Sequence, residues 1–198
     1  MISLEQGTRL VSLARQAMEM HVLGNPLSIP ADIKKESGAN QGCFVTLRTG
    51  DKLRGCIGYP EPIMPLYEAV ASAATNVTYR DHRFPPVDAM EFADLRIEVD
   101  ILTKPLLLEV EGPDEYLDMI VIGRDGLLLR SEKNTGLLLP QVATRFGWTP
   151  QEFLEHTCMK ANMPKDGWQE HEAVRVYTFQ VEAFREVELR SEVVRIQI

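Results

Sequence analysis

The sequence has no hydrophobic run long enough to cross a membrane. A transmembrane helix needs roughly 18 consecutive apolar residues, and no stretch of the chain approaches that length. The amino-terminal stretch MISLEQGTRLVSLARQAMEM is amphipathic and lacks the basic start and apolar block of a secretory signal. We therefore expect a cytoplasmic protein that does not bind membranes.

Cysteine is also scarce, with three residues and no CxxC pair: Cys43, Cys56 and Cys158. An odd number of thiols without close pairs does not favour a disulfide framework. The four histidines show no spacing typical of zinc ligands: His21, His82, His156 and His171. We expect neither a metal ion nor another cofactor.

The chain lacks the excess of positive charge that nucleic-acid binding needs. It carries 21 Lys and Arg against 29 Asp and Glu, which gives a net charge of −8. Affinity for phosphate backbones comes mostly from Lys and Arg contacts, so a nucleic-acid partner is not expected. A local basic patch remains an alternative if Arg54, Arg80 and Arg83 converge.

Apolar residues at helical spacing predict four helices, over residues 3–20, 65–80, 141–147 and 149–163. Thr149, Pro150 and Glu152 form the start signal of the last one, a capping box. The stretches 24–40 and 81–92 are rich in Pro, Gly or Asn and are expected to be loops.

Alternating residues predict strands. A hairpin is expected over residues 42–59, and a strand over residues 95–102 with one face in water. The β pattern continues over 106–111 and 119–140, where Gly126 is expected at positive φ in a turn. One long strand is expected from Val174 to Phe184.

Strands and helices do not alternate as repeated βαβ units. We therefore expect an α+β fold, with a mainly antiparallel sheet flanked by helices. The whole chain is interpreted as one domain, with a lobe boundary near residues 103–113. The final strand is expected to pair back with the early hairpin.

The stretch LRGCIGYPEP, residues 53–62, places one thiol between two glycines. Either the backbone at Gly55 and Gly58 packs too tightly for side chains, or these glycines let a ligand approach the sulfur of Cys56. A nearby cation such as Arg54, or a helix N-terminus, lowers a thiol pKa and favours nucleophilic attack. Cys56 is therefore a candidate nucleophile, and a buried structural cysteine is the alternative.

The loop RDHRFPP supplies candidate partners for this thiol. His82 is the nearest base in sequence, with Asp81 beside it as an orienting group, whereas a solvated loop histidine is the alternative. Arg83 is a candidate anchor for a carboxylate or phosphate, unless it fastens the loop by an ion pair. The candidate ligand-binding residues are Arg54, Gly55, Gly58, Asp81, Arg83 and, in the block LLLPQVA, Gln141.

Together these blocks resemble the AMMECR domain family. LRGCIG, residues 53–58, is that family's hallmark. It is followed in the family's order by PLYEAV, RFPP, YLDMIVIGRDGLLL, GLLLPQVA, GWTPQEFLEHTC and FQVEAF. The likeness extends from about Gly42 to Phe184.

The resemblance implies an α+β protein of two lobes, with the Cys56 segment at a cleft between them. It implies no particular reaction. Asp81 and Arg83 match the family's loop, whereas His82 does not, and this mismatch weakens its assignment as a base. Prokaryotic members resemble protein A of the AmmeMemoRadiSam system, which implies a Memo-type protein and a radical S-adenosylmethionine protein as partners.

Two hypotheses for function follow. In the first, Arg54 and Arg83 hold a small anionic ligand that the Cys56 thiol contacts or attacks, in a thiol-dependent enzyme or a ligand-binding component. In the second, the LRGCIG segment is structural, and the chain is a non-catalytic protein-interaction or scaffold module.

Overall fold

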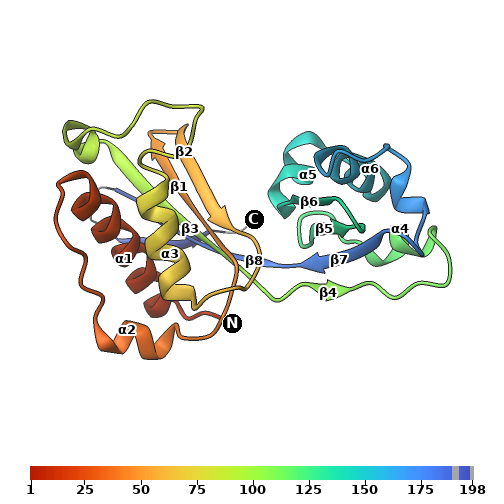
Figure 1. The fold of residues 1–198 in the computed structure, drawn as a ribbon, viewed down its shortest axis with the longest axis horizontal. Helices are drawn as coiled ribbons and strands as arrows, with labels where there is room; N and C mark the ends of the chain where they lie inside the picture. Colours follow the sequence, from red (N-terminus) through yellow and green to blue (C-terminus); the bar gives the residue numbers. More distant parts are fainter. Residues whose placement is uncertain (189–191, 197–198) are drawn as a thin grey trace. The chain divides into compact units, whose positions relative to one another are not determined.

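A computed structural model describes residues 1–188 and 192–196 of the chain. These residues divide into two compact units (Figure 1). The first unit contains Met1–Leu102 and the C-terminal segment that begins at Glu182, and the second contains Thr103–Val181. Each unit combines one β-sheet with helices, so the predicted α+β class is confirmed.

The first unit is built on a five-stranded sheet with the strand order β2-β1-β3-β8-β9. Its strands are β1 Cys43–Thr49, β2 Lys52–Tyr59, β3 Leu95–Leu102, β8 Val181–Glu186 and β9 Val193–Ile196. Its helices are α1 Leu4–Val22, α2 Ala31–Glu36, α3 Leu66–Asn76 and a 3₁₀ helix over Ala89–Ala93. The predicted helices at the N-terminus and after the hairpin are confirmed, whereas α2 lies in a stretch that was expected to be a loop.

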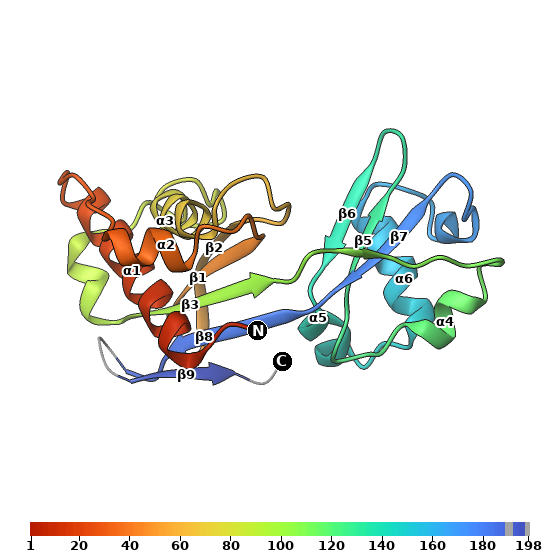
Figure 2. The ribbon, with the colours of Figure 1, turned by 90° about the horizontal axis from the view of Figure 1, so that it is seen from below.

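Helices α1 and α3 pack side by side on one face of this sheet (Figures 1 and 2). The alternating apolar residues of β1 and β3 point to the same face and form the core with them. Its fully buried members include Leu10, Val11, Ala14, Val45, Leu47, Val70, Ile97 and Val99. The polar residues of the same strands therefore point to the opposite face, which carries Cys56.

Along β3, the acidic residues of that opposite face are shielded from solvent, so the expectation of a solvated strand face is wrong. Glu98 and Asp100 are only 8% and 3% exposed. The carboxylate of Glu98 lies 3.4 Å from Arg48 Nε on β1 and 3.7 Å from Arg185 Nη1 on β8. Long basic side chains on the neighbouring strands thus cover this carboxylate and pair with it.

The second unit contains a four-stranded sheet with the order β4-β7-β5-β6, in which neighbouring strands are antiparallel. Its strands are β4 Leu106–Leu107, β5 Gly126–Arg130, β6 Thr135–Leu138 and β7 Arg175–Phe179. Its helices are α4 Glu115–Met119, α5 Pro140–Phe146, α6 Pro150–Lys160 and a 3₁₀ helix over Gly167–Gln169. Helix α6 starts with the predicted capping box of Thr149 and Glu152.

The structure corrects two further expectations. The tail is not one strand, because β7 and β8 belong to different sheets and are separated at Gln180, whose N–H donates to Thr103 Oγ1 over 2.8 Å. The turn before β5 uses Gly123, with φ of 85°, and not Gly126. Gly126 lies inside β5, where a Cβ atom would fall 2.4 Å from the ring of Phe179.

No helix within residues 1–188 and 192–196 is both long enough and apolar enough to span a lipid bilayer.

Candidate functional site

Cys56 lies on β2, one of the two edge strands of the five-stranded sheet in the first unit. It pairs across the hairpin with Thr46, and both side chains point to the face that the helices do not cover. The Thr46 hydroxyl donates a hydrogen bond to Cys56 Sγ over 3.3 Å. Cys56 is half-buried, whereas Cys43 and Cys158 are fully buried. Cys56 is therefore the most accessible thiol of the chain.

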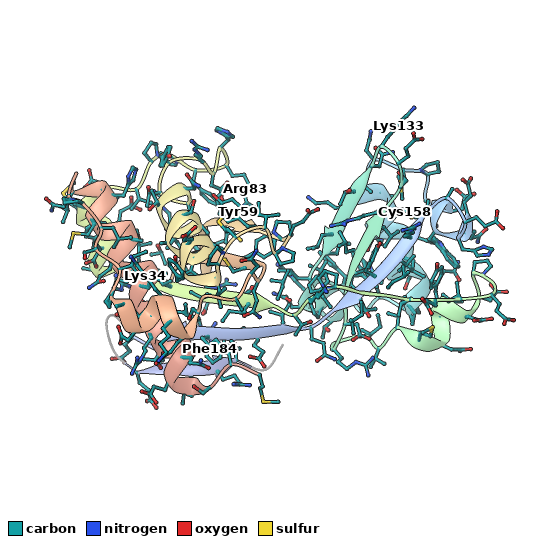
Figure 3. The ribbon with its side chains drawn as sticks, turned by 60° about the horizontal axis from the view of Figure 1, so that its bottom comes forward. Lys34, Tyr59, Arg83, Lys133, Cys158 and Phe184 are labelled. Atoms are coloured by element: carbon teal, nitrogen blue, oxygen red, sulfur yellow. The ribbon has the colours of Figure 1, made fainter. Side chains whose placement is uncertain are left out.

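Asp81 joins the thiol segment to a cation. The backbone N–H of Cys56 donates to Asp81 Oδ2 over 2.8 Å. Arg83 donates from Nε to Asp81 Oδ1 over 2.8 Å and from Nη2 to Oδ2 over 2.7 Å. The Asp81 side chain is 6% exposed and that of Arg83 is 57% exposed. The carboxylate is thus buried and fully engaged, while the guanidinium reaches solvent on the loop after α3 (Figure 3).

This arrangement fixes the charge of Asp81. The Arg83 guanidinium, and then the N–H groups of Cys56 and Arg83, hold the pKa of the Asp81 carboxyl well below its usual range. Burial acts in the opposite direction but is outweighed. Asp81 is therefore ionised at neutral pH and forms a stable link between β2 and the loop.

The environment of Cys56 keeps its thiol protonated. Burial raises the pKa of Cys56, and the negative charges of Asp100 and Asp81 act in the same direction. The hydrogen bond from Thr46 and the charge of Arg83 lower it without reversing the shift. A thiolate nucleophile at neutral pH needs a lowered pKa, so the environment does not favour the nucleophile expected from the sequence.

The two glycines of the motif accommodate close packing. A Cβ atom on Gly58 would lie 2.3 Å from the Cys43 carbonyl oxygen and 2.4 Å from Phe44 Cδ1. A Cβ atom on Gly55 would lie 2.9 Å from Val77 Cγ2. Of the two explanations that the sequence left open, the structure favours tight backbone packing over access to the sulfur.

Arg54 is engaged inside the protein. Its Nε and Nη2 donate to the two carboxylate oxygens of Glu91 over 2.7 and 2.9 Å, and Nη2 also donates to the Pro85 carbonyl over 3.1 Å. Its side chain is 13% exposed. Arg54 therefore fastens the proline loop and the 3₁₀ helix to β2, and this engagement does not favour the role of anion anchor expected from the sequence.

His82 and Gln141 do not join this cluster. His82 is exposed, and both oxygens of Asp81 are taken by Arg83 and Cys56, so Asp81 does not orient His82 as proposed from the sequence. Gln141 is a half-buried residue of the first turn of α5, in the second unit. The cluster that the structure brings together is thus Cys56, Asp81 and Arg83.

Sequence reasoning missed two residues of this site. Thr46 could have been found, because the turn at Gly50 sets the hairpin register and so the residue opposite Cys56. Glu91 gave no such signal, because it reaches Arg54 only through the folding of a long loop. Within the described residues, no group of three or more Cys, His, Asp or Glu side chains is arranged to hold a metal ion.

The fold and site define a class of α+β proteins with a cysteine-bearing edge hairpin, and comparisons with known proteins identify it. The AMMECR1 family model matches residues 11–184. The chain is 45% identical over 196 residues to protein MJ0810 of Methanocaldococcus jannaschii, covering 98% of this chain and 96% of that one. It is 46% identical over 186 residues to a protein of Methanothermobacter thermautotrophicus, covering 93% and 96%.

A solved structure shows the same fold. The crystal structure of an uncharacterized protein, PH0010, from Pyrococcus horikoshii is similar with a TM-score of 0.90 and 42% identity, covering 98% of each chain. This chain belongs to the AMMECR1 family.

Proposed function

We propose that the chain is a cytoplasmic ligand-binding component in which the cluster of Cys56, Asp81 and Arg83 contacts an anionic group. The observation that supports this proposal is the bridge through Asp81, which ties a solvent-reaching guanidinium to the backbone of the cysteine. The thiol acts in its protonated form, as a weak hydrogen-bond donor and apolar contact, because its pKa is raised.

Arg83 suits the role of anchor because its donors are only partly used. A guanidinium carries five N–H donors in a planar fork that matches carboxylate and phosphate oxygens. Asp81 accepts from Nε and Nη2, and these bonds orient the group without burying it. Exposed Arg80 adds positive charge on the same loop. An anionic ligand is therefore the class that this surface fits.

We also propose that the chain acts with a Memo-type protein and a radical S-adenosylmethionine protein, as its family resemblance implies. Affinity capture with the tagged full chain in its native host tests this. Recovery of both proteins above the level of an unrelated tagged protein supports the partnership, and recovery of neither contradicts it.

Alkylation with charged and neutral reagents tests the anion site. Mass spectrometry measures the rate at which Cys56 is alkylated by iodoacetate and by iodoacetamide. The ratio of these two rates reports the attraction of an anion to the thiol, because a change in thiol pKa affects both rates equally and cancels. Arg83→Gln is expected to lower this ratio several-fold by removing the nearby charge.

Arg124→Gln is the matched control. Arg124 binds Asp125 with the same two bonds, of 2.8 and 2.7 Å, and its side chain is 54% exposed, but it lies in the second unit. It is expected to leave the ratio unchanged. An unchanged ratio in Arg83→Gln would contradict the anion site.

A scaffold module is the second candidate. It is favoured by the packing at Gly55 and Gly58 and by the burial of Arg54 against Glu91. These contacts explain the LRGCIG segment by its role in the fold, without a ligand. Cys56→Ser separates the two functions. An unchanged Tm together with altered ligand capture supports binding, whereas a lowered Tm with unchanged capture supports the scaffold.

A further inference from the structure

The outer edge of β2 presents main-chain groups beside Cys56. The direction of these groups follows from the register of the sheet. The N–H of Leu102 donates to the Gly42 carbonyl over 2.9 Å, so the even-numbered residues of β1 bond to β3. Phe44 and Thr46 accordingly turn their N–H and C=O groups away from β2. In an antiparallel pair, directly opposite residues alternate between pairs that bond to each other and pairs whose main-chain groups point away from each other. Phe44 and Thr46 belong to the second kind, so their partners on β2, Gly58 and Cys56, point their N–H and C=O groups to the outer edge.

The bond between Cys56 and Asp81 supports this direction independently. The Cys56 N–H points away from β1 and donates to the Asp81 carboxylate, which stands where the carbonyl of a further strand would stand. Beyond Asp81, the Cys56 carbonyl and both main-chain groups of Gly58 lie along the same edge. In the sheet order of the described residues, β2 is the last strand on this side. Such an edge is a template for an added strand.

The charge near this edge selects the occupant. Arg80 and Arg83 are exposed on the adjoining loop, whereas Asp81 is buried and paired with Arg83. With two arginines against one aspartate, the segment Arg80–Arg83 keeps an excess of positive charge in a chain whose net charge is −8. We infer that the outer edge of β2 binds an extended acidic segment of a partner polypeptide, by strand addition next to the Cys56 thiol. The inference rests on the proposed function and names its anionic ligand as a polypeptide.

The added segment would use both features of the site. Its main chain bonds to the Cys56 carbonyl and to the outward N–H and C=O groups of Gly58. An acidic side chain of the segment reaches Arg83. Because the segment then lies beside the sulfur, it shields Cys56 from small reagents in solution.

A set of synthetic peptides tests the inference on the full chain. The probe is an acetylated peptide that alternates valine with glutamate, and the readout is the rate of Cys56 alkylation by iodoacetamide. At saturation the probe is expected to slow alkylation by about tenfold or more, through main-chain pairing and charge. Arg83→Gln is expected to weaken this protection, and Arg124→Gln is expected to leave it intact.

Two control peptides separate the causes. N-methylation of alternate amides removes the donors that an added strand needs, and replacement of glutamate by lysine reverses the charge. Equal protection by either control peptide overturns the inference, as does no protection by the probe. Protection that grows with protein concentration in the absence of peptide also overturns it, because the occupant is then a second copy.

Failure of this inference is distinguishable from failure of the proposed function. If Arg83→Gln lowers the iodoacetate ratio while the probe gives no protection, the site binds anions but not an added strand. If the ratio does not change, the anion site itself is wrong.

Discussion

Asp81→Asn is expected to weaken the link between β2 and the loop after α3. The asparagine oxygen can still accept the Cys56 N–H, which Asp81 accepts over 2.8 Å. The amide carries no charge, however, and its NH₂ group places donors against the donors of Arg83. Both bonds that now hold the Arg83 guanidinium are therefore lost or weakened.

The size of the effect follows from the exposure of the two partners. A hydrogen bond to a charged group contributes about 1.5–3 kcal/mol when buried, whereas an exposed ion pair contributes about 0.2–1 kcal/mol. The Asp81 side chain is 6% exposed but that of Arg83 is 57% exposed, so solvent screens the pair. We expect a loss of about 1–2 kcal/mol in the free energy of unfolding at neutral pH.

Asp125→Asn is the matched control in urea unfolding. Asp125 is bound by Arg124 in the same way and also accepts the Val121 N–H over 2.9 Å. The Asp125→Asn variant should lose a similar amount of free energy of unfolding. Only Asp81→Asn should speed Cys56 alkylation, because it removes a negative charge that raises the thiol pKa and loosens the strand edge.

The difference in unfolding free energy between wild type and Asp81→Asn should depend on pH with a defined sign. The pKa of Asp81 is lowered in the folded state, so its stabilising contribution is present above the unfolded value of about 3.9. It is lost as the pH falls through the folded value. The gap between wild type and Asp81→Asn should thus be constant near neutrality and shrink below about pH 4. Equal unfolding free energies at neutral pH, with equal Cys56 alkylation, would refute the reasoning.

Two further predictions concern the hairpin itself. Gly58→Ala should cost about 1–3 kcal/mol in urea unfolding, because its Cβ meets the fixed Cys43 carbonyl. Gly112→Ala, where no atom lies within 4 Å of the added Cβ, should be close to neutral, and equal costs would contradict the packing argument. Thr46→Val should shift the pH profile of Cys56 alkylation upward, because it removes a hydrogen bond that lowers the thiol pKa, whereas Thr46→Ser should not. Superimposable profiles for wild type and Thr46→Val would show that this bond has no influence.

Much of the secondary structure was predictable from local patterns. The helix at Leu4–Val22, the hairpin and the capping box at Thr149 were found because periodicity and caps depend on residues a few positions apart. The same patterns failed where a distant partner decides the outcome. In the tail, the apolar residues change from even positions at Val174 and Val176 to odd positions from Phe179 to Ala183. This shift alone does not show that the two parts belong to different sheets, separated at Gln180.

The site shows the same division. The sequence by itself determined that a single thiol stands between two glycines, near a loop with Asp81 and Arg83. Tertiary structure alone decided that Asp81 accepts the Cys56 N–H, that Arg54 pairs with Glu91, and that burial raises the pKa of the thiol. The physical reason is that hydrogen-bond direction and desolvation depend on atoms brought together from distant parts of the chain, which no short stretch of sequence contains.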